Sequence, residues 1–97
     1  MKNLKLREKI MLELMDSTRG GGRIFGVVFR KRSTGVLRAM TCRLGVHKGV
    51  KGSGGPYVPD DKNLLTVYEM PQSHFRMIPI EGVRSLTIDG LRIVIAQ

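Results

Sequence analysis

The stretch RIFGVVFRKRSTGVLRAMTCR, residues 23–43, is typical of one β-hairpin: two arms (23–30 and 36–43) joined by the turn KRSTG (31–35). Both arms are rich in the β-branched and aromatic residues that favour strands, and the turn ends in glycine. Side chains alternate along a strand, so one face of the first arm is expected to be core: Phe25, Val27 and Phe29. One face of the second arm mixes charge with apolar groups and leaves its register open: Arg38, Met40 and Cys42.

Four more strand patterns follow downstream, at residues 64–70, 75–80, 84–88 and 91–95. Asp89-Gly90 between two alternating apolar runs is the strongest local hairpin signal in the chain. Pro79 indicates an edge strand or a strand end. Six short strands with tight turns and no intervening helix pattern predict a mainly β domain, a small barrel that closes its own edges.

Upstream, residues 3–16 have the spacing of an amphipathic helix, with Leu6, Ile10 and Leu14 on one stripe and Met11 and Met15 beside them. Asn3 is the expected N-cap, and Gly20-Gly21-Gly22 is expected to end the helix and form a hinge. Two domain segments result: residues 1–22, the helix and hinge, and residues 23–97, the barrel with a long Gly/Lys-rich loop at 44–63. The helix is expected to cover one barrel mouth; the alternative is a helix for oligomerisation or a partner.

Positive charge is the most informative global property. The net charge is +9, and residues 17–59 contain no Asp or Glu. That stretch carries nine cations: Arg19, Arg23, Arg30, Lys31, Arg32, Arg38, Arg43, Lys48 and Lys51. Such a field attracts phosphate backbones, nucleotides, acidic proteins or anionic lipid. The loop at 48–55 (KGVKGSGG) combines glycine N–H groups with lysines, which suits phosphate binding, but it lacks the P-loop pattern, and a mobile connecting loop is the favoured interpretation.

Catalytic constellations are not recognisable in this sequence. Cys42 lies in mid-strand among apolar residues, His47 and His74 lack zinc-site spacing, and Asp60-Asp61 is typical of a turn. We therefore expect no enzyme activity, no metal and no cofactor. One cysteine and no membrane-spanning or signal-like apolar run favour one cytoplasmic domain with no membrane partner.

Three motifs carry a resemblance to a known family: FRKRSTGVLRAMTCR (29–43), LTVYE (65–69) and FRMIPI (75–80) running into VRSL (83–86). Over residues 28–95 the chain resembles the phage and prophage proteins described as WYL-like, although it has no Trp-Tyr-Leu tripeptide. The resemblance implies an SH3-like (Sm-like) barrel of five to six antiparallel strands preceded by one N-terminal α-helix. It also implies a ligand-sensing module whose arginines at the barrel mouth bind nucleotide-like or nucleic-acid ligands, Arg76 first and Arg38 second.

Two functional hypotheses follow. The first is a non-catalytic, phage-encoded module that binds nucleic acid or a nucleotide. In this hypothesis each guanidinium group donates paired hydrogen bonds to phosphate oxygens, and the tyrosine stacks on a base. The candidate ligand residues are Arg30, Lys31, Arg38, Arg43, Lys48, Lys51, Tyr57 and Arg76. The second is a protein-interaction module, a homo-oligomer or an inhibitor of a host protein, that acts through the N-terminal helix and the barrel edges. Steep salt dependence of binding separates the first from the second.

Overall fold

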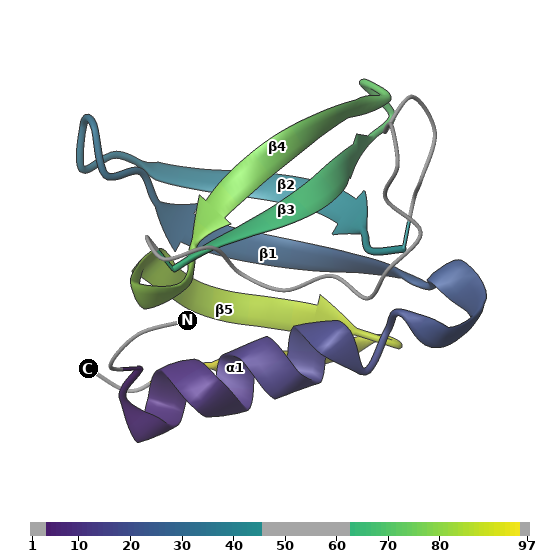
Figure 1. The fold of residues 1–97 in the computed structure, drawn as a ribbon, viewed down its shortest axis with the longest axis horizontal. Coiled ribbons are helices and arrows are strands. Elements are labelled where there is room, and N and C mark those ends of the chain that lie inside the picture. The colour runs from purple at the N-terminus through teal and green to yellow at the C-terminus, as the bar shows by residue number, and fades with distance from the viewer. Residues whose placement is uncertain (1–3, 46–62, 96–97) are drawn as a thin grey trace.

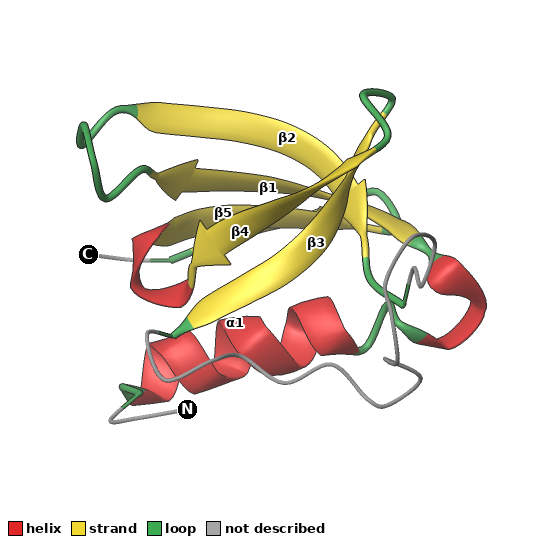
Figure 2. Cartoon of the chain, turned by 45° about the horizontal axis from the view of Figure 1, so that its top comes forward, coloured by secondary structure: helices red, strands yellow, loops and turns green. Residues whose placement is uncertain are grey.

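Six antiparallel strands form one sheet in the computed structural model, which describes residues 4–45 and 63–95 (Figure 1). The strands are β1 (Ile24–Arg30), β2 (Leu37–Arg43), β3 (Leu64–Met70), β4 (His74–Pro79), β5 (Val83–Ile88) and β6 (Leu91–Val94). Their order in the sheet is β4-β3-β2-β1-β5-β6. The sheet curls, so that β3 and β4 cross over β1 and β5 (Figure 2), but β4 and β6 do not pair and the sheet stays open. The predicted mainly β class with one N-terminal helix is confirmed.

The first hairpin forms where the sequence predicts it. β1 and β2 pair in continuous register from Ile24 opposite Arg43 to Arg30 opposite Leu37. Its inner face is apolar as expected, and five side chains from the two strands are buried: Phe25, Val27, Phe29, Met40 and Cys42. These side chains form the centre of the core, and Arg38 lies on the same face at its margin.

The other turns also follow local signals. Asp89 and Gly90 have φ angles of 51° and 79°, the two positive values of a type I′ turn, and they join β5 to β6. β4 is an edge strand and ends at Pro79, where the missing N–H does not interrupt the ladder. Between β4 and β5 the chain makes one turn of 3₁₀-helix, η2 (Ile80–Gly82).

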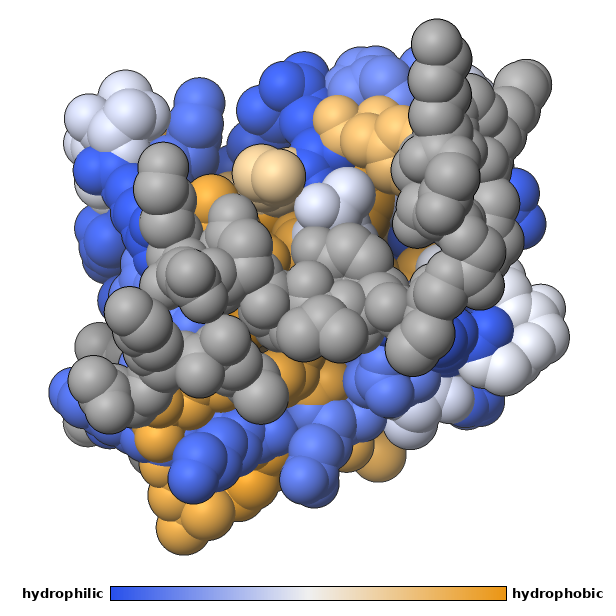
Figure 3. Space-filling model, viewed as in Figure 1, coloured by the Kyte–Doolittle hydropathy of each residue, from blue (hydrophilic) through white to orange (hydrophobic). Residues whose placement is uncertain are grey.

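The N-terminal helix, α1 (Leu6–Asp16), turns toward the core the two methionines beside the predicted stripe and, of that stripe, only Leu14. Met11 and Met15 are buried in the core, whereas Leu6 and Ile10 are exposed. Both stripes are apolar, so periodicity alone could not choose between them, and packing against β5 and η2 does. Figure 3 shows apolar surface at the lower margin, where Figure 1 places the start of α1.

The helix also begins later than predicted. Lys5 is the N-cap, and its backbone N–H donates to Glu8 Oε1 at 2.9 Å, as in half of a capping box. Asn3, the N-cap expected from the sequence, lies outside the described residues. After the helix, Gly20–Gly22 form a 3₁₀ turn, η1, in which Gly21 has a φ of 80° that favours glycine. No helix within residues 4–45 and 63–95 is long and apolar enough to cross a membrane.

Candidate anion-binding site

A cleft of about 340 Å³ opens beside the β1–β2 turn, between that turn and strand β4. The residues that line it are Phe29, Lys31, Arg32, Ser33, Arg38, Met40, Leu64, Arg76, Met77 and Pro79. Its floor is therefore apolar and its rim carries four cations. A cleft of similar volume is lined by residues of β1, β2, β3 and β5 and by Gln72 of the β3–β4 turn; Glu69 is among them, and no lysine or arginine is among the described residues that line it. Positive charge thus distinguishes the first cleft.

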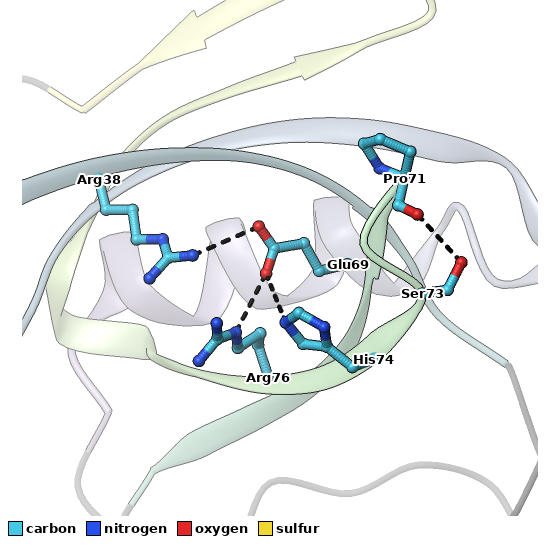
Figure 4. A network of polar contacts seen from close by, with 6 residues as sticks. All are labelled: Arg38, Glu69, Pro71, Ser73, His74 and Arg76. Atoms are coloured by element: carbon cyan, nitrogen blue, oxygen red, sulfur yellow. Dashed lines mark hydrogen bonds and ion pairs between the residues drawn. The ribbon is translucent and has the colours of Figure 1, made fainter.

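Two of its arginines converge on one carboxylate, that of Glu69 (Figure 4). Arg76 donates from Nε to Glu69 Oε1 at 3.1 Å, and Arg38 donates from Nη2 to Oε2 at 3.4 Å. Nε2 of His74 lies 3.2 Å from Oε1, which is an ion pair when the imidazole is protonated, although the atoms are not aligned for a hydrogen bond. Glu69 thus holds three basic side chains from two strands in one place.

Burial makes this carboxylate an unusual one. The Glu69 side chain is only 5% exposed, whereas Arg38 and Arg76 are 33% and 45% exposed. Burial alone would raise the pKa of Glu69, but the hydrogen bond from Arg76 and the positive charges of Arg38, Arg76 and His74 outweigh it, so the pKa lies below its ordinary value. Glu69 is therefore ionised at neutral pH and pins the two guanidinium groups.

Strand register brings these residues together. Glu69 lies opposite Cys42 on β2 and opposite His74 on β4, and Val67 lies opposite Arg76. Alternation then places the inward-facing residues of β4 beside those of β3. The turn between the two strands is closed by the Ser73 N–H, which donates to the Glu69 carbonyl at 2.8 Å, and by Ser73 Oγ, which donates to the Pro71 carbonyl at 3.1 Å (Figure 4).

The opposite rim of the cleft is held by a second carboxylate. Arg32 donates to Glu81 through two parallel contacts, Nε to Oε2 at 2.8 Å and Nη2 to Oε1 at 2.7 Å. This forked pair lowers the pKa of Glu81, against the opposing effect of burial. It fixes the β1–β2 turn to η2, and Lys31 lies in the same turn with no carboxylate partner among the described residues.

The remaining charge of the cleft is positive. Arg76 uses only Nε, and Arg38 only Nη2, in the contacts to Glu69. Their other N–H groups have no partner in the described part of the chain, and they lie on a cleft that Lys31 also lines. Pre-positioned guanidinium groups with free donors are suited to the oxygens of a phosphate or carboxylate.

Not all of the predicted ligand residues gather here. Lys31, Arg38 and Arg76 line the cleft, but Arg30 instead donates to the Gly35 carbonyl within the turn. Arg43 lies on the outer face of the sheet, 5.9 Å from the centre of the Tyr68 ring. Neither Arg30 nor Arg43 is therefore among the residues that line the cleft. Lys48, Lys51 and Tyr57 lie outside the described residues.

Sequence reasoning missed Glu69, His74 and Arg32. For Glu69 a signal exists, because it continues the buried alternation of Leu65 and Val67. A carboxylate at a core-facing position requires cations nearby, and that requirement could have identified the network. Arg32 gives no such local signal, since its partner Glu81 is far away in the sequence.

Cys42 lies opposite Glu69 on β2, and its buried thiol is expected to be unreactive. Burial, with a further contribution from the Glu69 charge, raises the pKa of its thiol to about 12. The thiolate is the reactive form, so we expect no alkylation of the folded protein by iodoacetamide near pH 8 and full alkylation in denaturant. Mass spectrometry of the intact chain measures both. Modification of the folded chain at the rate of the unfolded one would contradict the buried position.

Comparisons of this chain with protein-family models, curated proteins and solved structures found no match.

Proposed function

We propose that this chain is a non-catalytic binding module whose cleft takes the phosphate group of a nucleic acid or nucleotide. The observation that carries the proposal is the pair Arg38 and Arg76, held by the buried Glu69 with their remaining N–H groups on the cleft. Lys31 adds a third positive charge at the same cleft. The apolar floor, which includes Phe29 and Met40, suits the less polar part of such a ligand.

The charge of the whole chain supports the same function. A net charge of +9 raises the local concentration of polyanions and speeds their association. The acids nearest the cleft, Glu69 and Glu81, are already paired with arginines. They therefore position cations more than they repel an approaching anion.

The proposal includes the fold type. We assign the curled sheet to the SH3-like (Sm-like) barrels of the WYL-like phage proteins that the sequence resembles. Four strands in meander order, then the single 3₁₀ turn η2 and the return of β5 to pair with β1, support this assignment. In that arrangement Arg38 and Arg76 lie at the mouth between the two halves of the sheet.

Fluorescence anisotropy with labelled DNA, RNA and nucleotides tests the function. We expect binding that weakens by orders of magnitude between about 50 and 200 mM salt. Arg38→Lys and Arg76→Lys should each weaken it roughly 10-fold, because lysine keeps the charge that pairs with Glu69 but loses the planar fork. The exposed Arg92 lies on β6 outside the cleft, so Arg92→Lys is the matched control and should bind as the wild type does.

Absence of binding at low salt, or equal losses for Arg76→Lys and Arg92→Lys, would contradict the proposal. Association of the protein with itself or a host protein that ignores salt and is lost in Leu6→Ala or Ile10→Ala would replace it. Both of those side chains are exposed on α1.

A further inference from the structure

A row of three side chains crosses the outer face of the sheet, on the side opposite the Glu69 network. Arg43 on β2 lies opposite Tyr68 on β3, which lies opposite Phe75 on β4. The guanidinium carbon of Arg43 is 5.9 Å from the centre of the Tyr68 ring. The Tyr68 and Phe75 rings meet edge to face, with centres 5.1 Å apart and planes at 72°. The row therefore ends at the edge strand β4 with Phe75.

Exposure increases along this row toward the edge. Tyr68 is buried, Phe75 is 37% exposed, and Met77, two residues further along the same face of β4, is 56% exposed. The Tyr68 ring packs against one side of the Phe75 ring and fixes its orientation. The exposed part of the Phe75 ring therefore faces solvent in one position. A rigid exposed ring beside an adaptable methionine is a typical surface for stacking a planar ligand.

Arg43 adds an unsatisfied donor to the same row. Its Nε is buried and has no hydrogen-bond partner, and no carboxylate within the described ranges pairs with it. A ligand cannot reach the buried Nε, but the positive charge of Arg43 beside the Tyr68 ring attracts an anionic ligand to this face. The outer face thus places the Phe75 ring and the Arg43 cation on one side of the sheet, and Met77, beside Phe75, also lines the cleft that contains Arg38 and Arg76.

Strand β4 connects the two faces. Arg76, which points into the cleft, lies between Phe75 and Met77 in the chain, and successive Cα atoms are only about 3.8 Å apart. Because β4 is an edge strand, no other described strand lies along its outer side, where its two faces meet. A flexible ligand with alternating phosphates and planar rings can therefore place a phosphate on Arg76 and a ring on Phe75.

We propose that β4 is the contact edge for a single-stranded nucleic acid, with one phosphate held by Arg38 and Arg76, a neighbouring base stacked on Phe75 against Met77, and the strand continuing toward Arg43. This proposal rests on the proposed function and specifies its ligand. A duplex keeps its bases stacked inside and offers no free base face to Phe75, whereas a single strand does.

The test compares two labelled probes, an oligothymidylate of about ten nucleotides and an abasic sugar-phosphate strand of equal length, within the range of known single-strand sites. Phe75→Leu should weaken binding of the oligothymidylate about 5- to 150-fold, the effect of losing one base–aromatic stack, and leave binding of the abasic strand unchanged. Leu91→Ala, at an exposed apolar position on β6, is the control and should change neither. Arg76→Lys should weaken both.

The outcomes separate this inference from the function on which it rests. If Arg76→Lys weakens both probes but Phe75→Leu weakens neither, the cleft binds phosphate and base stacking on β4 is wrong. Equal weakening of both probes by Phe75→Leu shows a structural role for the ring and also overturns the inference. Preference for a duplex over the single strand of the same sequence overturns it too. If neither probe binds wild-type protein but a nucleotide or a duplex does, the inference fails and the proposed function stands; if none of these ligands binds at low salt, the proposed function itself fails.

Discussion

Replacing both cleft arginines, Arg38→Ala with Arg76→Ala, should lower the free energy of unfolding by about 3 kcal/mol at neutral pH. The reason is the carboxylate left behind. Glu69 is 5% exposed, and in the double variant it loses the hydrogen bond and both guanidinium charges that offset its burial. Of the three basic side chains that the described part of the chain places on Glu69, only His74 remains, with Nε2 3.2 Å from Oε1. Urea denaturation followed by circular dichroism measures the change.

A third substitution provides the decisive comparison. Adding Glu69→Gln to the double variant removes the buried charge and should restore most of the lost stability, so that three substitutions are less destabilising than two. Glu69→Gln alone should be milder than the double variant, because Arg38 and Arg76 are one-third to one-half exposed and water can solvate them. A triple variant no more stable than the double would contradict the assignment of the penalty to Glu69.

The pH dependence of stability should also change sign. In the wild type the folded-state pKa of Glu69 is below its ordinary value of 4.5, so its contribution to stability is present above that value and is lost as pH falls through the folded pKa. Without the two arginines, burial is the dominant influence and raises the folded pKa. Stability of the double variant should then increase as pH falls toward 4.5, and its deficit against the wild type should shrink in acid.

The strands of this fold could be predicted because their signals are local. Alternation in residues 23–43 and the Asp89-Gly90 turn depend only on neighbours in the chain, and the observed strands begin within one residue of the predicted ones for that reason. The buried stripe of α1 was not predictable in this way. Met11 and Met15 face the core because β5 and η2 lie against them, a contact between distant segments.

The candidate site likewise depends partly on local sequence signals and partly on contacts between distant segments. Arg38 and Arg76 were recognisable one at a time, but their meeting on Glu69 depends on how β3 registers against both β2 and β4. Alternation along the strand does separate two of the candidate residues: Arg38 and Arg43 are an odd number of residues apart on one strand, so they point to opposite faces. The resulting separation distinguishes the inner cleft, which Arg38 lines, from the outer row of Arg43, Tyr68 and Phe75.

Gly82→Ala should be about as destabilising as the arginine pair, at roughly 3 kcal/mol, the upper end of ordinary overpacking. A Cβ on Gly82 would lie 2.6 Å from the carbonyl oxygen of Arg30 and 3.2 Å from Pro79 Cγ. The first of these atoms belongs to the backbone of β1, so relief requires a shift of η2 against the sheet. Sequence alone gave no sign of this, because Gly82 and Arg30 are far apart in the chain.

The matched control is Gly20→Ala, whose Cβ would meet no atom within 4 Å and whose φ is not positive. It should leave stability within about 0.5 kcal/mol of the wild type, the range of a surface substitution. Equal urea midpoints for the two alanine variants would contradict the close packing of η2 on β1. Because η2 also carries Glu81, which fixes Arg32 at the rim of the cleft, Gly82→Ala should weaken anion binding as well as stability, whereas Gly20→Ala should change neither.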